Sequence, residues 1–494
     1  MRYKNIHFSL FILLIASSSS FAQNNERIFF DNKDSTGNYY LAVKPLSGNI
    51  KGALVLFSSF SNLENVLAET KLHNIAYGND LLTVFVSLNT KLCADRESIE
   101  RINEVLKHVR NKFEVDSEKF ALGGFDFAGN IILRYAELAF EHPAQFPIKP
   151  KAVFAIACPV DLIALMKRSE NQIKKNFYPG AVGDAKYILN ALTTENGPLD
   201  KNLQKYIDLS SFYTASDTSG NERYLKNVAL RLYYDTDIGW ELKNRRNSVD
   251  DTNIPDGSEM IKRLLLLGNN DAEFVAAKMP AMRSTGMRNT NAWSIVDEVD
   301  CVLWIRRKLN IFDPFTYVPD YFLTIPDKWG VERFQFPIEF AKAIPYKGIE
   351  DVRFAPGWGD KNSSEYWSYC FLWWLNSDPQ INLNDLQEDL KMYYTGLVGR
   401  NILVRKIPAE KLVPVVATLK KIKQDANDLE TYRGTVNMLD YMIQEPMVLH
   451  VVIHVRNCTA TNRKALFFEI SPKPETDPVW TSMNSIFSEF RCLK

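Results

Sequence analysis

Between residues 53 and 157 the sequence alternates short apolar runs with longer amphipathic segments. The short runs, rich in β-branched and aromatic residues, are 53–57, 81–88, 119–122 and 152–157. Between them, residues 96–113 and 128–140 repeat apolar side chains at helical spacing. Because parallel strands need crossover connections, this alternation predicts an α/β doubly wound domain, with helices on both faces of a parallel sheet.

The segments on either side complete the predicted first domain, residues 23–312. Residues 27–30 and 39–44 flank a polar turn and predict a hairpin. From 161 to 225 the rhythm breaks into polar, helical sequence, which predicts a lid-like insertion over one end of the sheet. Further strands are predicted at 228–234 and 264–267, and a closing helix at 294–309.

Asp313-Pro314 and the region around Pro319 mark a predicted boundary. The sequence beyond it contains many strand-like runs and few helical ones, so residues 313–494 are predicted to form an α+β domain with a mainly antiparallel sheet. The predicted strands are 321–326, 333–338, 352–356, 366–374, 415–423, 433–441, 447–456 and 464–470, and the predicted helices are 383–397 and 479–490.

The first 22 residues have the three parts of a secretory signal peptide. Arg2 and Lys4 supply positive charge, residues 8–16 an apolar run, and Ser20-Phe21-Ala22 a cleavage site. The chain is therefore expected to be exported, to the periplasm or the cell exterior, and no later apolar segment is long enough to span a membrane. Export permits disulfides, and Cys458 with Cys492 is the candidate pair. Cys93, Cys158, Cys301 and Cys370 lie among apolar residues and are expected to be buried thiols.

Charge and motif spacing exclude some classes of partner. Lys plus Arg and Asp plus Glu both total 59, and no basic stripe indicates nucleic-acid binding. No cofactor motif or metal-ligand spacing is present. His450 and His454 share a strand face, but no carboxylate or cysteine stands at a useful spacing, so the favoured interpretation is a core or surface position for each.

The most informative segment is Gly124-Phe125-Asp126-Phe127-Ala128. It joins a predicted strand to a predicted helix, and small residues stand two positions before and two after Asp126. A sharp strand-to-helix turn requires this spacing, because it leaves no room for side chains there. With this turn, the lid-like insertion and the closing helix, residues 27–310 resemble the α/β hydrolase fold family, and Asp126 occupies the position of its nucleophile.

The resemblance also implies positions for the other catalytic groups. The nucleophile is serine in most of the family, and the histidine base is expected at Asn291, whose amide cannot accept a proton near neutral pH. Asp235 or Asp237 would be the acid, although a charged loop contacting Arg245 or Arg246 is the favoured interpretation. Ser58 lies at the end of the first long strand, and the backbone amides of Phe60 and Phe127 are candidates for an oxyanion site. The sequence thus predicts a hydrolase scaffold without a working triad.

The second predicted domain is rich in aromatic residues. Residues 366–374 place apolar side chains on both faces of one strand, which favours a strand buried between two layers. Trp358, in a Pro-Gly-Trp-Gly loop, is the candidate for an exposed contact residue.

Three hypotheses follow. The leading one is a catalytically inactive, exported α/β hydrolase homologue that binds a small ligand, a glycan or a protein. The first alternative is a secreted esterase- or peptidase-like hydrolase, or one that uses Asp126 as its nucleophile. The second is a carbohydrate-binding surface or periplasmic protein. The sequence does not identify the ligand.

Overall fold

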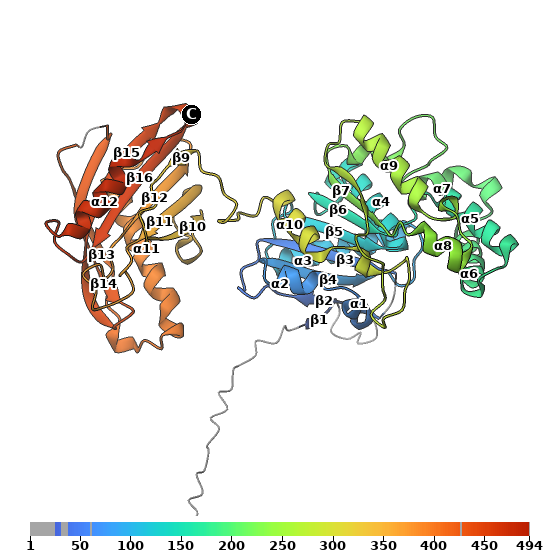
Figure 1. Ribbon diagram of the computed structural model, residues 1–494, viewed down its shortest axis with the longest axis horizontal. Helices are drawn as coiled ribbons and strands as arrows, with labels where there is room; N and C mark the ends of the chain where they lie inside the picture. Colours follow the sequence, from blue (N-terminus) through green and yellow to red (C-terminus); the bar gives the residue numbers. More distant parts are fainter. Residues whose placement is uncertain (1–24, 31–37, 60–61, 425–426, 494) are drawn as a thin grey trace, which may run out of the picture. The chain divides into compact units, whose positions relative to one another are not determined.

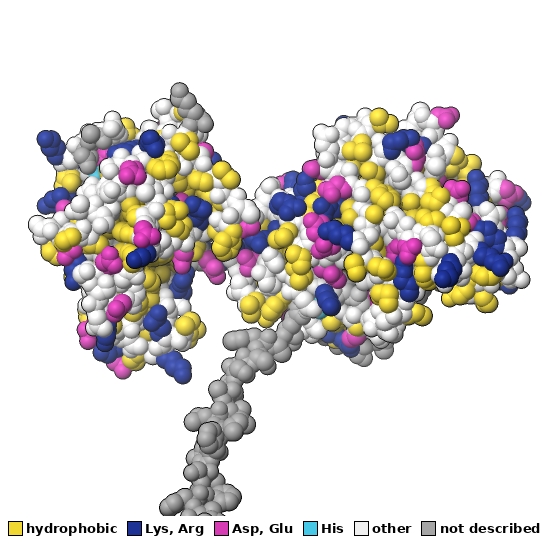
Figure 2. Space-filling model, in the orientation of Figure 1, with side chains coloured by type: hydrophobic (Ala, Val, Ile, Leu, Met, Phe, Trp, Pro, Cys, Tyr) yellow, Lys and Arg dark blue, Asp and Glu magenta, His cyan; other side chains and the backbone are white. Residues whose placement is uncertain are grey.

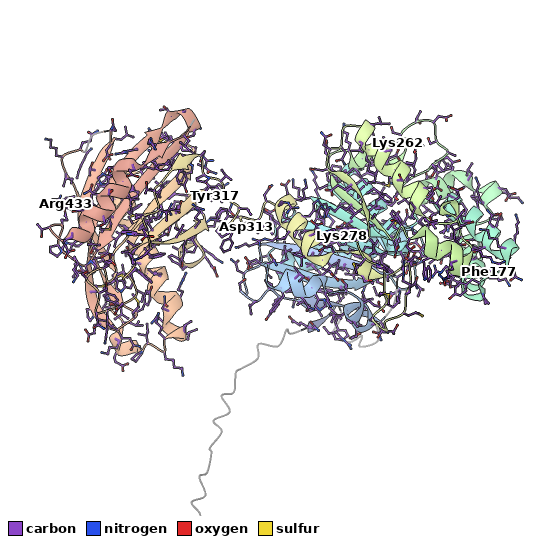
Figure 3. All side chains as sticks on the ribbon, viewed as in Figure 1. Phe177, Lys262, Lys278, Asp313, Tyr317 and Arg433 are labelled. Carbon is purple, nitrogen blue, oxygen red and sulfur yellow. A yellow bond between two sulfur atoms is a disulfide. The ribbon has the colours of Figure 1, made fainter. Side chains whose placement is uncertain are left out.

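The computed structural model describes residues 25–30, 38–59, 62–424 and 427–493. The chain divides into two compact units between Ile311 and Phe312 (Figure 1). Asp313 and Tyr317 follow directly after this division (Figure 3). The predicted signal peptide, residues 1–22, lies outside the described residues.

Eight strands form the sheet of the first unit within the described ranges, in the order β1-β2-β4-β3-β5-β6-β7-β8. Their bounds are β1 Asn25–Phe29, β2 Tyr39–Val43, β3 Gly52–Ser58, β4 Leu81–Ser87, β5 Phe120–Phe125, β6 Ala152–Ile156, β7 Ala229–Tyr234 and β8 Ala272–Ala276. β1 and β2 form the predicted antiparallel hairpin, and β3 to β8 run parallel to one another. The carboxyl ends of these six strands therefore meet at one edge.

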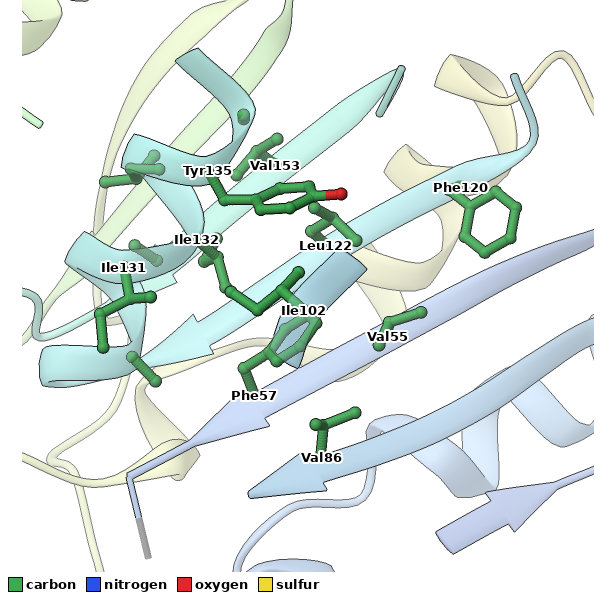
Figure 4. Close-up of a cluster of buried hydrophobic side chains, with 14 of the residues drawn as sticks. Val55, Phe57, Val86, Ile102, Phe120, Leu122, Ile131, Ile132, Tyr135 and Val153 are labelled. Carbon is green, nitrogen blue, oxygen red and sulfur yellow. The ribbon is translucent and has the colours of Figure 1, made fainter. Parts of the chain in front are cut away.

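Helices cover both faces of this sheet, as a doubly wound fold requires. The bounds of these helices are α1 Leu63–Glu69, α2 Leu72–Tyr77, α3 Arg96–Lys112, α4 Phe127–Glu141, α9 Ile254–Leu266 and α10 Glu298–Lys308. One core lies under α3, α4 and α9, where Ile102, Ile132 and Tyr135 pack on Val55 and Leu122 of the sheet (Figure 4). The opposite core lies under α1, α2 and α10. The predicted fold class, an α/β doubly wound domain with helices on both faces of a parallel sheet, is confirmed.

One predicted strand is wrong. Residues 264–266 form the end of α9 and Leu267 is its C-cap, and the last strand of the sheet is β8. Met260, Ile261 and Leu264 are buried along one helix face, whereas Leu265 and Leu266 are exposed. The run of four leucines continues a helical pattern that begins earlier in the chain. Taken alone, four consecutive apolar residues are also typical of a buried strand, which is why a strand was predicted here.

The segment from 161 to 225, here called the lid, is helical. Its helices are α5 Leu162–Lys175, α6 Pro179–Asn196 and α7 Leu203–Leu209, and they gather beyond one end of the strands together with α8 Ile238–Arg245 (Figure 1). Leu162, Met166 and Leu192 pack on Phe127, the first residue of α4. The side chain of Asn130 donates to the backbone oxygen of Leu209, 3.1 Å away, which also holds the lid to α4.

The second unit is an antiparallel sheet with a helix on each face, ordered β10-β11-β12-β16-β15-β14-β13. The bounds of its strands and helices are β9 Tyr321–Phe322, β10 Gly330–Gln335, β11 Gly348–Phe354, β12 Tyr369–Asn376, α11 Leu383–Val404, β13 Val416–Lys421, β14 Glu430–Asp440, β15 Glu445–Cys458, β16 Arg463–Ser471, α12 Pro478–Glu489 and β17 Arg491–Cys492. On β12, Phe371 and Trp373 face the α11 side, whereas Cys370 and Leu372 face the α12 side. The strand is buried on both faces, as expected.

A disulfide joins Cys458 at the end of β15 to Cys492 in β17, the pair that the sequence singles out. The other four cysteines, Cys93, Cys158, Cys301 and Cys370, are free and buried. No helix of the described chain combines the length and apolar character needed to cross a bilayer.

Trp358 and His454 of the second unit both have neighbours that sequence spacing does not reveal. Trp358 is half-buried, and its ring packs against Phe354 at 4.7 Å and Trp367 at 5.7 Å between centroids. His454 is buried in the core, as favoured, and it has carboxylate neighbours, since its Nδ1 lies 2.7 Å from Asp428 and its Nε2 3.6 Å from Glu469. Both carboxylates come from segments distant in sequence, so spacing alone could not reveal them. No group of three or more possible metal ligands occurs among the described residues.

Candidate functional site

The turn between β5 and α4 has the strained geometry that its small residues predicted. Asp126 adopts φ 54° and ψ −126°, in a region that residues with a side chain rarely occupy. A Cβ on Gly124 would lie 2.6 Å from the backbone oxygen of Ala128, so only glycine fits there. The backbone N–H of Asp126 donates to the oxygen of Ile156 at the end of β6, 2.9 Å away. The turn thus holds the carboxyl group of Asp126 at the carboxyl edge of the sheet.

A cavity of about 510 Å³ opens above this carboxyl group. Residues that follow the parallel strands form its floor, including Ser59 after β3, Thr90 after β4 and Ala157 after β6, as expected for a ligand site in an open α/β sheet. The lid covers it with residues of α5 and α6. Its lining includes Leu92, Asp126, Phe127, Leu165, Arg168, Asp184, Ile188, Asp235, Glu241, Arg245, Asp251, Arg283 and Asn291.

Burial raises the pKa of Asp126 to about 7, and a nearby carboxylate, Asp184 of α6, contributes in the same direction. The side-chain Nδ2 of Asn291 donates to Oδ2 of Asp126, 3.3 Å away, and this bond acts in the opposite direction because it favours the charged form. Near neutral pH the carboxyl group is therefore present in both protonation states.

Asn291 reaches Asp126 from the long connection between β8 and α10. Its backbone N–H donates to Oδ1 of Asn289, 3.0 Å away, which fixes the loop beside the cavity. The amide oxygen of Asn291 is buried, and no described residue donates to it. The contact is a hydrogen bond between an amide and a carboxyl group, and an amide nitrogen carries no lone pair that can accept a proton near neutral pH.

The two candidates for the acid position lie in different surroundings. Asp235 borders the cavity, forms an ion pair with Arg288 at 2.7 Å and accepts a hydrogen bond from the backbone of Ala281. Asp237 is exposed and caps α8, accepting from the N–H of Trp240 at 3.0 Å. The predicted contact with Arg245 or Arg246 is wrong, because Arg288 from the β8–α10 loop takes the position between both carboxylates.

Sequence reasoning missed a second polar group on the cavity wall. Buried Glu241 accepts from Thr290 Oγ1 at 2.6 Å, from Asn247 Nδ2 at 2.9 Å and from Arg245 Nη1 at 3.3 Å. These residues come from α8 and two loops, and no local motif joins them. The sequence Asn289-Thr290-Asn291 was the available signal, since three consecutive hydrogen-bonding side chains stand at the predicted base position.

Of the residues predicted for an oxyanion site, one lines the cavity. Phe127 lines the cavity, but Ser58 is buried at the end of β3, and its neighbour Ser59 reaches the cavity instead. Phe60 lies outside the described residues.

None of the described histidines lines the cavity. His73 packs on Phe85 at 5.6 Å between ring centroids, His108 Nδ1 lies 2.9 Å from the hydroxyl of Tyr40, and His142 ends α4. His450 and His454 belong to β15 of the second unit. The side chain that reaches Asp126 from the β8–α10 connection is the amide of Asn291 and not an imidazole.

No family model matches the sequence, and no curated protein matches it. Among solved structures, the chain is similar to carboxyl esterase 2 from the fungus Tuber melanosporum, at 15% identity over 60% of this chain and 88% of that one, with a TM-score of 0.39. It is similar to a hormone-sensitive lipase from a metagenome library, at 11% identity over 58% and 87%, with a TM-score of 0.38. It is also similar to an esterase from the archaeon Pyrobaculum calidifontis, at 16% identity over 58% and 82%, with a TM-score of 0.36. The matched part is the N-terminal portion of the chain.

Proposed function

We propose that this chain is a hydrolase-like binding protein, whose first unit holds a small organic ligand above Asp126 without hydrolysing it. One observation carries the proposal: Oδ2 of Asp126 meets the amide of Asn291 at 3.3 Å, at the position from which a histidine would shuttle protons. Without a base at that position, water cannot be activated to release a covalent intermediate from Asp126.

The cavity supports a binding role. Its volume, about 510 Å³, lies within the range of roughly 300–1,000 Å³ that is usual for small-molecule sites. One wall is apolar, with Leu92, Phe127 and Leu165, and the other carries hydrogen-bonding side chains. Such a combination can enclose the body of a ligand and orient its polar group.

A second candidate function is hydrolysis with Asp126 as the nucleophile. The strained backbone at this position favours it, because strain of this kind is typical of catalytic turns. The carboxylates that could replace the missing base are already engaged, since Asp235 pairs with Arg288 and Glu241 accepts three hydrogen bonds.

Esterase assays separate these two functions. The protein is incubated with acyl esters of short and long chain, beside matched Asp126→Ala and Ser59→Ala variants. We expect no turnover above the buffer rate for any of the three proteins. Turnover that is lost in Asp126→Ala and retained in Ser59→Ala would replace the binding proposal with the nucleophile hypothesis.

We also propose that the protein works outside the cytoplasm. The signal-like residues 1–22 and the Cys458–Cys492 disulfide support this location. Expression of the full chain beside a chain without residues 1–22 tests it by cell fractionation. Recovery of both chains in the cytoplasm would contradict the proposal.

A further inference from the structure

The basic residues of the cavity lining all have acidic partners, whereas some of its acidic residues have no basic partner in the part of the chain that the structure describes. Each arginine on its wall already has a carboxylate partner: Arg168 pairs with Asp256 at 2.6 Å, Arg245 with Glu241 at 3.3 Å and Arg283 with Glu69 at 3.4 Å. Besides Glu241, basic groups neutralise two further lining carboxylates, since Asp235 pairs with Arg288 and Asp251 with Lys175. Among the described residues, Asp126 and Asp184 are the lining carboxylates without an ion-pair partner.

These two carboxylates belong to one electrostatic environment. Asp126 stands on the floor after β5, and Asp184 lies on α6 of the lid, where it is exposed. They are close enough for the charge of Asp184 to raise the pKa of Asp126, by more than the charge of Arg283 lowers it. A positive charge bound in the cavity would relieve this repulsion and would also favour the ionised form of Asp126.

Hydrogen bonding in the site points to the same kind of ligand. The oxygen of the Asn291 amide is a buried acceptor without a described donor, beside the amide nitrogen that meets Asp126. With the two carboxylates it makes a set of acceptors, of which Asp126 already accepts a bond from the Asn291 amide nitrogen. An ammonium group has three N–H donors and no acceptor, so it fits this set, whereas a carboxylate or phosphate would add further acceptors.

We propose that the cavity binds an organic ammonium ion, a protonated amine attached to an apolar body, with the charged group near Asp126 and Asp184 and the body against Leu92, Phe127, Leu165 and Ile188. This inference rests on the proposed binding function and names its ligand class. The apolar residues belong to the contact between the lid and α4, so the ligand body would bind where the lid meets the sheet.

Calorimetric titration of the full chain at pH 8 with three probes of one shape tests the proposal: phenethylamine, phenethyl alcohol and hydrocinnamate. They carry a cation, a neutral hydroxyl group and an anion on the same ring. At this pH most of Asp126 is ionised. We expect the amine to bind about tenfold or more tightly than the alcohol, and the anion to bind most weakly.

Variants assign the charge effect to the cavity. Asp126→Asn is expected to weaken binding of the amine about tenfold. Asp184→Asn should weaken it about twofold to fivefold, less because Asp184 is exposed. Asp200→Asn is the matched control, since Asp200 is an exposed carboxylate of the lid outside the cavity, and it should leave the affinity unchanged.

Failure of this inference is distinguishable from failure of the binding proposal. Equal affinity for the three probes, tighter binding of the anion, or no binding of the amine at millimolar concentration would overturn the ammonium inference. The binding function itself falls only if the esterase assays above detect turnover that depends on Asp126.

Discussion

The two units each contain a buried carboxyl group with a pKa raised to about 7, but in different surroundings. In both Asp126 and Glu350, burial is the largest cause of the shift. Glu350 lies inside the aromatic core of the second unit and accepts from Trp373 Nε1 at 2.9 Å and from the hydroxyl of Tyr393 at 2.8 Å. Asp126 stands on a strained turn beneath an open cavity, and one side-chain amide donates to it.

This difference shows that a raised pKa does not by itself identify a functional site. Burial raises the pKa of a carboxyl group in a closed core as much as at the floor of a cavity. Glu350 supplies two acceptors that its neighbours need, so its role is structural. Asp126 combines strain, open volume and unmatched charge, and only this combination points to a ligand.

The largest expected effect comes from removing the structural carboxyl group. Glu350→Ala leaves the donors of Trp373 and Tyr393 buried without an acceptor, and we expect the unfolding free energy of the second unit to fall by about 2–4 kcal/mol at pH 5. Denaturant unfolding measures it. Glu332→Ala on exposed β10 should change the value by less than about 0.5 kcal/mol. Equal effects of the two variants would remove the contrast between the units.

Asp126 should behave in the opposite way. Its folded pKa is about 7, above the ordinary value of 3.8, so the folded state holds the proton more tightly, and stability is lost as pH rises from about 4 to 7. Asp126→Asn removes this titration. We expect it to raise the unfolding free energy of the first unit by about 1–3 kcal/mol at pH 8 and to change it little at pH 4. If Asp126→Asn is destabilised at pH 8, the folded protein stabilises the ionised carboxylate, and this prediction is contradicted.

The smallest expected effect is a change in the pKa of Asp126. The Asn291 amide lowers the pKa of Asp126, so Asn291→Ala should raise that pKa by about 0.5–1 unit. Carboxyl ¹³C chemical shifts followed through a pH titration measure the change. Asn74→Ala, an exposed residue of α2, is the control and should leave the titration of Asp126 unchanged.

Local patterns in the sequence predicted much of the fold. Alternating apolar runs indicated the parallel sheet, and the small residues around Asp126 indicated the strained turn, because both depend on neighbours within a few positions. Residues 264–267 were wrongly predicted to form a strand, because a short apolar run fits a strand and a buried helix equally well. Trp358 is half-buried because its ring packs on Phe354 and Trp367, and the Pro-Gly loop around it does not indicate these contacts.

The candidate site was predictable only in part, for the same physical reason. The turn and the loop that carries Asn291 follow defined strands, so their meeting at one sheet edge could be expected. Ion pairs such as Asp235 with Arg288 depend on side-chain directions across different loops, which sequence spacing does not encode. The overall charge is balanced, and acidic and basic side chains are interspersed on the face drawn in Figure 2. The negative character of the cavity therefore appears only when each pair is assigned.

The short pairing of β9 with β17 has a consequence for how the second unit can be handled. Tyr321 lies opposite Cys492 in this ladder, and the backbone N–H of Leu493 donates to the oxygen of Asp320 at 3.0 Å. The first and last strands of the unit are thus neighbours. A brief peptide linker would suffice to join them, so new chain ends could be opened in a surface loop, and a circularly permuted form should keep the sheet order.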